Sequence, residues 1–306
     1  MKKIKIFSPA TVANVACGFD ILGFALNSPG DEISIETNVH HKIVLYNETS
    51  YELPSAPEDN ATAVALQSML DFLKTSQGFT VTFLKKIMPG SGVGSSAASA
   101  AAGVFGANEL LGRPFTRKEL VRFAMQGERV ASGSAHADNV APALMGGFTL
   151  VRSYNPLDII PIPSPEIYAT VVHPQIEVRT SDSRKILRQE VAIKKAIEQW
   201  GNVAGLVAGL FSNDYDLIGR SLHDVIVEPV RALLIPEFYT VKQAVLDAGA
   251  LGCSISGSGP SIFALSKTLS IAEQVAQTMQ NGFNNIGIDN NVFVSLINKE
   301  GCRVME

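Results

Sequence analysis

Cysteine is scarce in this sequence of 306 residues, which contains Cys17, Cys253 and Cys302 and no C-x-x-C pair. An odd number of widely spaced cysteines argues against a disulfide framework and against a zinc ribbon. We therefore expect three reduced thiols, as is typical of a cytoplasmic protein.

Charged residues are also few, at 18% of the chain against about 25% in an average globular protein. Lysine and arginine number 25 and aspartate and glutamate 29, so the net charge is −4 without any basic excess. This balance argues against nucleic acid as a partner. The hydrophobic share of 46% argues against intrinsic disorder, and the length is enough for about two domains.

Long apolar runs are missing as well. The most apolar stretch, residues 97–111, contains Gly103, Gly106, Asn108 and Glu109 and cannot cross a membrane. The first nine residues lack the apolar core of a signal peptide. These absences predict a cytoplasmic protein with no membrane partner.

Alternating and helical patterns interleave along the chain, which predicts an α/β or α+β fold. Strands are expected at 3–6, 33–36, 79–83, 148–152, 167–172, 262–265 and 292–297, and helices at 62–74, 116–130, within 183–223, 236–248 and 271–283. A turn is expected at Pro29-Gly30-Asp31, and Thr116 with Glu119 forms a capping box. The segment 154–165 has four prolines and no helical pattern, so we expect it to connect two domains.

The most informative segment is a glycine-rich loop that leads into an alanine-rich helix. Its residues are Pro89, Gly90, Ser91, Gly92, Val93, Gly94, Ser95, Ser96, Ala97, Ala98 and Ser99. Glycines let backbone N–H groups approach a ligand closely, and a helix N-terminus adds free donors. The loop therefore predicts an anion cradle, best suited to nucleotide phosphates. The alternative is a flexible loop with tight helix packing.

This loop differs from two common phosphate-binding motifs. The chain contains no Gly-Lys pair, so the loop is not a Walker A motif. Ser95 stands where the third glycine of G-x-G-x-x-G would be. A second glycine cluster at 249–261 would alone be a tight connection, but two such loops indicate the walls of a shared cleft.

Polar residues in apolar surroundings are further candidates for a site. Asn14 and Asp20 lie in a segment of small residues, where they could contact a substrate or form Asx turns. Glu128 and a serine hydroxyl could hold Mg²⁺, although a solvated helix residue is the alternative. Arg184 and Arg231 could bind a carboxylate bidentately or form surface ion pairs. The absence of H-E-x-x-H and G-x-S-x-G argues against zinc peptidases and serine hydrolases.

Taken together, the segments at 9–20, 89–99 and 249–261 resemble, in order and spacing, the three signature motifs of the GHMP small-molecule kinases. Within that superfamily the chain is most similar to the members that phosphorylate L-homoserine. The similarity rests on Pro9-Ala10-Thr11, Ala13-Asn14, Gly18-Phe19-Asp20, His136-Ala137-Asp138-Asn139 and Glu228-Pro229 with Arg231. It covers essentially the whole chain.

The resemblance implies an α+β fold with two domains. The N-terminal, ATP-binding domain (residues 1–153) would resemble domain 2 of ribosomal protein S5. The C-terminal domain (residues 166–306) would be ferredoxin-like, and 154–165 would join the two. A homodimer is implied as well.

The resemblance also implies a reaction: ATP phosphorylates the side-chain hydroxyl of L-homoserine to O-phospho-L-homoserine, a step of threonine biosynthesis. The loop at 89–99 would hold the ATP phosphates, Asn60 would lie near the adenine, and Ser96 and Glu128 would bind Mg²⁺. Gly257 and Ser258 would close the cleft from the second domain.

The substrate residues carried over from the resemblance are Asn14, Asp20, His136, Asp138, Asn139, Arg184 and Arg231. Arg184 and Arg231 would clamp the carboxylate, and His136 would be a neighbour in the pocket. The others would contact the amine and the hydroxyl. Asp20 would orient the hydroxyl, while Asn139 stands where other family members have an aspartate. Because an amide accepts protons poorly, this site would lack a strong general base.

One motif departs from the family pattern. The family usually has Leu-Gly-Pro-Gly-Phe-Asp, whereas this chain has Val15-Ala16-Cys17-Gly18-Phe19-Asp20, which puts a thiol beside the expected pocket. Two alternatives remain open: a GHMP kinase for a sugar, mevalonate or a shikimate-like alcohol, and a catalytically silent relative. Two arginines with Asn14 and Asp20 favour an amino-acid substrate over a neutral sugar.

Overall fold

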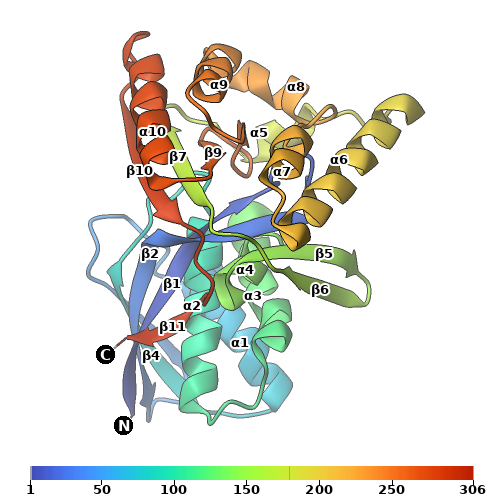
Figure 1. The fold of residues 1–306 in the computed structure, drawn as a ribbon. Coiled ribbons are helices and arrows are strands. Elements are labelled where there is room, and N and C mark those ends of the chain that lie inside the picture. Colours follow the sequence, from blue (N-terminus) through green and yellow to red (C-terminus); the bar gives the residue numbers. More distant parts are fainter. Residues whose placement is uncertain (1, 179, 306) are drawn as a thin grey trace.

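A sheet of seven strands, built mainly from the first half of the chain, supports the pocket described below. The computed structural model describes residues 2–178 and 180–305, with the backbone alone at residues 132, 180 and 181. The strands are β1 (Lys3–Ala13), β2 (Leu22–Asn38), β3 (Ile43–Asn47), β4 (Gly78–Lys85), β5 (Phe148–Tyr154), β6 (Leu157–Ile162) and β11 (Arg303–Met305). Their order is β11-β1-β2-β4-β3, and the β5–β6 hairpin branches from β2 (Figure 1). The pairing of β1 with β11 brings the two chain ends together.

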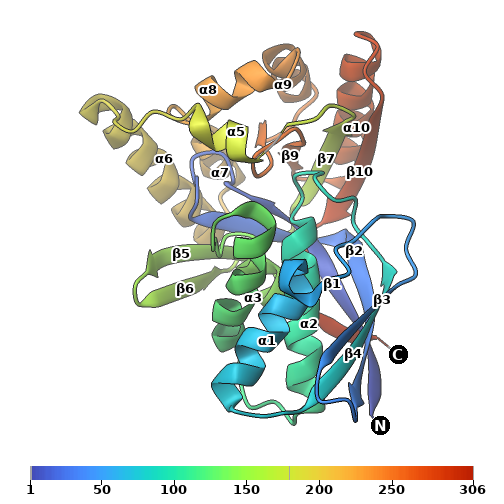
Figure 2. The same cartoon turned by 180° about the vertical axis from the view of Figure 1, so that it is seen from behind.

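Helices cover one face of this sheet (Figure 2). They are α1 (Ala61–Leu73), preceded by the short 3-10 helix η1 (Pro57–Asp59), α2 (Ser95–Leu110), α3 (Arg117–Ser132) and α4 (Val140–Met145). The small residues of α2 let it pack closely in the centre of the layer. A Cβ on Gly103 would lie 2.5 Å from Cγ2 of Thr62, and one on Gly106 would lie 2.6 Å from Cγ2 of Ile35. The alanine-rich composition of α2 therefore reflects close packing on the sheet.

The second sheet has four antiparallel strands. They are β7 (Tyr168–Pro174), β8 (Gly252–Ile255), β9 (Ile262–Ser266) and β10 (Asn290–Leu296), in the order β10-β7-β9-β8. The helices of this half are α5 (Thr180–Lys185), α6 (Ile193–Ser212), α7 (Tyr215–Ser221), α8 (Glu228–Arg231) with η2 (Ala232–Leu234), α9 (Phe238–Asp247) and α10 (Leu269–Asn284). Helices α9 and α10 fill the two crossover positions of a ferredoxin-like arrangement.

Aromatic side chains join the two halves. Phe24 of β2 lies with its ring centroid 5.0 Å from that of Phe148 and 5.6 Å from that of Phe263 in the second sheet. All three rings are buried. Such a large, apolar contact holds the two sheets in one arrangement.

The structure confirms the α+β fold and most of the predicted elements. The capping box of α3 is present, with Glu119 N–H donating to Thr116 Oγ1 (3.3 Å) and Thr116 N–H donating to the Glu119 carboxylate (2.8 Å). No helix in residues 2–178 or 180–305 has the length and apolarity that crossing a membrane requires.

Several local predictions were wrong. Strand β2 runs through the expected turn at residues 29–31. The expected connection 154–165 contains β6, whose one proline, Pro161, is tolerated because the strand lies at the edge of the sheet. Strand β8 lies within the cluster at 249–261, and β1 extends to Ala13. Residues 303–305, in the expected second domain, pair with the first sheet.

Candidate active site

A pocket of about 890 Å³ lies between the two halves of the molecule and is lined by both. It brings together most of the predicted site residues: Asn14, Asp20, Asn60, Pro89, Gly90, Gly92, Gly94, Ser95, Ser96, Ser99, Glu128, His136, Asp138, Asn139, Arg184, Arg231, Gly257 and Ser258. Ser91, Val93, Ala97 and Ala98 do not line it. The last three pack into the hydrophobic core, and the hydroxyl of Ser91 donates to the carbonyl of Met88 (2.7 Å).

The glycine loop has a backbone that requires glycine. Gly90, Gly92 and Gly94 have φ values of 75°, 74° and 67°, in the left-handed region. A Cβ on Gly94 would lie 2.1 Å from Thr11 Oγ1. Gly94 is also the N-cap of α2 and provides no side-chain cap, so side-chain capping does not occupy the first N–H groups of this helix. Such N–H groups bind anions well.

The loop after β8 contacts the glycine loop directly. Ser256 Oγ donates to the carbonyl of Gly92 (2.7 Å), and Ser261 Oγ donates to the carbonyl of Ser91. Asn14 Nδ2 donates to the carbonyl of Gly257 (2.6 Å). The two glycine-rich segments therefore form adjoining walls of one pocket.

Asn60 lines the other end of this pocket, but its side chain has a structural role. Its Oδ1 accepts from the N–H groups of Thr62 (3.0 Å) and Ala63 (3.3 Å), and its Nδ2 donates to the carbonyl of Pro54 (2.9 Å). These bonds cap α1. That Asn60 lies near the adenine of ATP stays a prediction.

Ser96, in the first turn of α2, and Glu128 form a pair of oxygen-bearing side chains that could bind a cation. Glu128 comes from α3 and is 6% exposed. Burial raises the pKa of its carboxyl, whereas a hydrogen bond with Ser96 and the charge of Lys86 lower it. Within residues 2–178 and 180–305 no cluster of three or more His, Cys, Asp or Glu could hold a metal. A carboxylate with a hydroxyl fits Mg²⁺ that takes its other ligands from phosphate and water.

Asp20 lies beside Arg184 and His136, at the end of the pocket that the resemblance assigns to the substrate and that is called the substrate end below. Both of its carboxylate oxygens accept from Arg184 Nη2, at 2.9 and 3.1 Å. The same nitrogen donates to His136 Nε2 (2.9 Å), so His136 is the acceptor and is neutral. Burial lowers the pKa of His136, in agreement with this state. Asn14 Oδ1 accepts from the N–H of Asp20 (2.9 Å) and fixes its backbone.

Arg231 is 4% exposed, which excludes the surface ion pair as its role. Its Nη1 donates to the carbonyl of Gly257 (2.9 Å) and its Nε to that of Ser183 (3.3 Å). The guanidinium also lies 4.9 Å from the ring centroid of Phe19. Burial lowers the pKa of Arg231 to about 10, so it stays charged at neutral pH. A buried cation that faces a pocket favours an anionic ligand.

Asp138 and Asn139 lie between the substrate end and the glycine loop. Burial, followed by the charges of Asp20 and Glu128, raises the pKa of Asp138 to about 7. Asn139 Oδ1 accepts from Thr11 Oγ1 (2.8 Å). A Cβ on Gly94 would lie only 2.9 Å from this oxygen, so Asn139 touches the start of α2.

Sequence reasoning missed Lys86, which lines the pocket with a side chain 5% exposed. Phe79, Val81 and Phe83 alternate along β4 and face inward, and this spacing of two would predict that Lys85 faces inward as well. Lys85 is exposed instead, because the pairing of β4 with β2 shifts register between Phe83 and Lys85 and breaks the alternation. A more useful signal was the position of Lys86 between a strand and the glycine loop.

Cys17 does not lie beside the pocket as expected. Its thiol is buried and donates to the carbonyl of Ser221 (3.3 Å) at the end of α7. Burial raises the pKa of this thiol to about 12. The departure from the family motif therefore affects packing under the loop and leaves the pocket wall intact.

Comparisons with known proteins agree with this geometry. Residues 60–147 match the model of the GHMP kinases N terminal domain, and residues 206–285 match that of the GHMP kinases C terminal domain. The homoserine kinase of Chloroherpeton thalassium is 50% identical over the whole of both chains, and that of Methanococcus vannielii is 43% identical over 87% of this chain and 89% of its own.

Solved structures extend the comparison. The crystal structure of homoserine kinase from Cytophaga hutchinsonii is similar with a TM-score of 0.94 and 52% identity, covering 100% of this chain and 98% of the other. Mevalonate kinase of L. major in complex with R-mevalonate has a TM-score of 0.71 at 18% identity, over 97% and 96% of the two chains. The latter similarity extends to the fold alone.

Proposed function

This chain belongs to the GHMP kinase family, and from that premise we propose that it transfers the γ-phosphoryl group of ATP to the side-chain hydroxyl of L-homoserine. The product is O-phospho-L-homoserine, an intermediate on the way to threonine. One observation carries the proposal: a single pocket joins a glycine loop before an uncapped helix to a buried arginine. The first suits phosphates and the second suits the carboxylate of an amino acid.

At the nucleotide end, this chain provides backbone donors. The N–H groups of the glycine loop and of the first turn of α2 would hold the ATP phosphates, while Ser96 and Glu128 would hold Mg²⁺. When bound, Mg²⁺ neutralises charge on the transferred phosphoryl group. The contact of Ser256 with the carbonyl of Gly92 keeps the loop in place.

At the substrate end, Arg231 and Arg184 bind the carboxylate, and Asp20 orients the hydroxyl towards the phosphates. Asn14, Asp138 and Asn139 contact the amine and the hydroxyl. When the substrate carboxylate binds Arg184, it competes with Asp20 for that guanidinium, which frees Asp20 for the substrate.

Neither Asn139 nor His136 provides a strong base at the hydroxyl. Asn139 has an amide that accepts from Thr11, and the Nε2 lone pair of the neutral His136 is used by Arg184. Phosphoryl transfer depends mainly on positioning and charge stabilisation, with a loose transition state. The hydroxyl proton therefore leaves late, to the transferred phosphoryl group.

Substrate choice is tested by a panel of alcohols in a coupled assay for ADP. We expect the highest kcat/KM with L-homoserine, over L-serine, L-threonine and mevalonate. Higher kcat/KM with mevalonate would favour the other GHMP activity, and ATP binding without turnover of any alcohol would favour a silent relative.

We also propose a cytoplasmic homodimer. Ile193, Ile197 and Trp200 are 64%, 58% and 62% exposed and lie along one face of α6, as at a subunit interface. The three cysteines are buried free thiols, as in a reducing compartment. Light scattering after size exclusion measures the mass in solution, and a value of 32.7 kDa, that of one chain, would contradict the dimer.

A further inference from the structure

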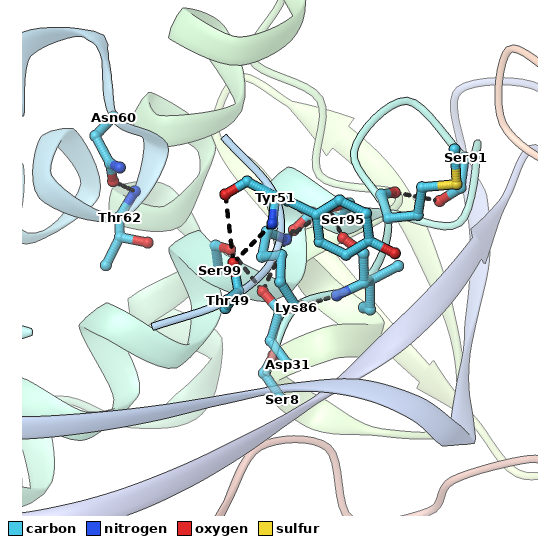
Figure 3. A network of polar contacts seen from close by, with 12 residues as sticks. Ser8, Asp31, Thr49, Tyr51, Asn60, Thr62, Lys86, Ser91, Ser95 and Ser99 are labelled. Carbon is cyan, nitrogen blue, oxygen red and sulfur yellow. Dashed lines mark hydrogen bonds and ion pairs between the residues drawn. The ribbon is translucent and has the colours of Figure 1, made fainter. Parts of the chain in front are cut away.

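Lys86 and Asp31 form a buried ion pair beneath the first turn of α2 (Figure 3). The side chain of Asp31 in β2 is 0% exposed, and its Oδ2 lies 2.9 Å from Lys86 Nζ. Asp31 Oδ1 accepts from the N–H of Ile87 (2.8 Å), and Oδ2 also accepts from Ser99 Oγ in α2 (2.6 Å). Both oxygens of this buried carboxylate are therefore used.

All three donors of the Lys86 ammonium group also have partners. An ammonium has three donors, and Lys86 has three acceptors: Asp31 Oδ2, the carbonyl of Ser95 (2.7 Å) and Ser95 Oγ (2.5 Å). Ser95 Oγ in turn donates to the carbonyl of Ile87 (2.8 Å). One cation thus joins β2, the residues after β4 and the first residue of α2.

The way in which α2 is fixed differs from that of α1, α3 and α10, whereas α6 and α9 also begin without a side-chain cap. Helices α1, α3 and α10 begin with a side-chain cap from Asn60, Thr116 and Thr268, which occupies N–H groups of the first turn. Helix α2 begins at Gly94, without a side-chain cap. Instead, Lys86 holds the first turn of α2 by donating to the carbonyl and hydroxyl oxygens of Ser95. This arrangement fixes the start of the helix and leaves its N–H groups available.

We propose that Lys86 and Asp31 are positioning residues for phosphoryl transfer, which fix the first turn of α2 so that its N–H groups and Ser96 meet the phosphates of Mg·ATP. The proposal rests on the kinase function proposed above. It requires no contact between Lys86 and the phosphates, since the ammonium already has its three acceptors. Ser96 follows Ser95 directly, so a shift of the first turn moves the predicted Mg²⁺ ligand as well.

The test removes both charges at once, because one buried charge left without its partner would destabilise the fold strongly. The double variant Asp31→Asn/Lys86→Met is compared with the wild type by calorimetric titration with Mg·AMP-PNP, a non-hydrolysable ATP analogue, and by steady-state kinetics. We expect analogue binding at least about tenfold weaker, since small displacements at a reacting centre are costly. The KM for L-homoserine should stay within about twofold.

A matched control removes a second buried pair on the other side of the pocket. Lys242 Nζ lies 2.6 Å from Glu228 Oε1, with side-chain exposures of 12% and 3%. The double variant Glu228→Gln/Lys242→Met affects α8, which contains Arg231, and should raise the KM for L-homoserine while analogue affinity stays unchanged. Opposite effects in the two double variants distinguish positioning from general loss of stability.

Two results would overturn the proposal: unchanged analogue affinity in the folded Asp31→Asn/Lys86→Met variant, or equal losses for the analogue and L-homoserine. If circular dichroism shows that this double variant does not fold, the affinity of the Ser99→Ala variant for the analogue is measured instead. That change removes one bond to Asp31, and analogue affinity equal to that of the wild type would then overturn the proposal. If the wild type binds the analogue but does not phosphorylate L-homoserine, the proposed substrate fails while the affinity comparison still stands.

Discussion

Substitution of Gly94 by alanine tests how closely the glycine loop, α2 and the substrate end are joined. Gly94 has φ of 67°, and a Cβ there would lie 2.1 Å from Thr11 Oγ1 and 2.9 Å from Asn139 Oδ1. Thr11 donates to Asn139 at 2.8 Å, so the methyl group would push into the hydrogen bond between them. The change therefore affects backbone conformation and packing at once.

The expected loss of stability is the sum of a backbone contribution and a packing contribution. A left-handed alanine costs about 1–2 kcal/mol, and overpacking a tight site adds about 1–3 kcal/mol. The sum of about 2–5 kcal/mol lowers the Tm by roughly 4–10 °C, at about 2 °C per kcal/mol for a chain of this length. If Asn139 moves by about 1 Å, kcat/KM for L-homoserine falls by about 100-fold.

Gly112→Ala provides the matched control. Gly112 has φ of 85° and no atom within 4 Å of the position of an added Cβ. The Gly112→Ala variant should therefore lose only the free energy of the left-handed backbone, about 1–2 kcal/mol. Gly112 lies between α2 and α3, away from the pocket, and the kinetics of the variant should match the wild type. Scanning calorimetry and the coupled ADP assay, run well below both Tm values, measure the two effects. Equal kcat/KM for the two alanine variants would refute the link between Gly94 and the substrate end.

Four further substitutions test individual side chains. Arg231→Ala removes a charge-assisted bond of roughly 1.5–3 kcal/mol, so kcat/KM for L-homoserine should fall by about 10- to 100-fold with the KM for ATP unchanged; equal damage to both substrates would indicate a folding role. Glu128→Gln should lower kcat and raise the Mg²⁺ concentration for half-maximal activity, and an unaltered Mg²⁺ dependence would remove Glu128 from the metal site. Asp20→Asn should lower kcat, whereas near-normal kcat would exclude the orienting role. The pKa of Asp138, raised to about 7, means that the folded state binds its proton more tightly than the unfolded state. Its carboxyl therefore costs stability as the pH rises from about 4 to 7, by up to about 1.4 kcal/mol per pH unit. Asp138→Asn should raise the Tm more at pH 8 than at pH 5, and equal gains would contradict the raised pKa.

The sequence made the pocket predictable because its main wall depends on local backbone chemistry. Gly90, Gly92 and Gly94 all have positive φ, which few other residues adopt, so their pattern is visible in the chain itself. The capping box of α3 is local in the same way. Three strands of the second half, β7, β9 and β10, were also predicted, since each is a short run rich in apolar residues.

Features that depend on tertiary pairing were not predictable. The turn expected around Asp31 follows from the preferences of its neighbours, but pairing with β1 and β4 extends β2 through it and buries the carboxylate. The prolines of 154–165 indicated a connection, whereas β6 forms between Pro156 and Pro163 and its edge position accommodates Pro161. The burial of Arg231 depends on elements far along the chain, and so does the ion pair of Lys86 with Asp31, although the position of Lys86 before the glycine loop is a local signal.

The central claim is most directly tested by identifying the product of the wild-type protein. After incubation with Mg·ATP and L-homoserine, ³¹P NMR and mass spectrometry should show a phosphate monoester on the side-chain oxygen, formed in equal amount with ADP. ADP with inorganic phosphate and no ester, or a phosphorylated product from mevalonate alone, would contradict the account.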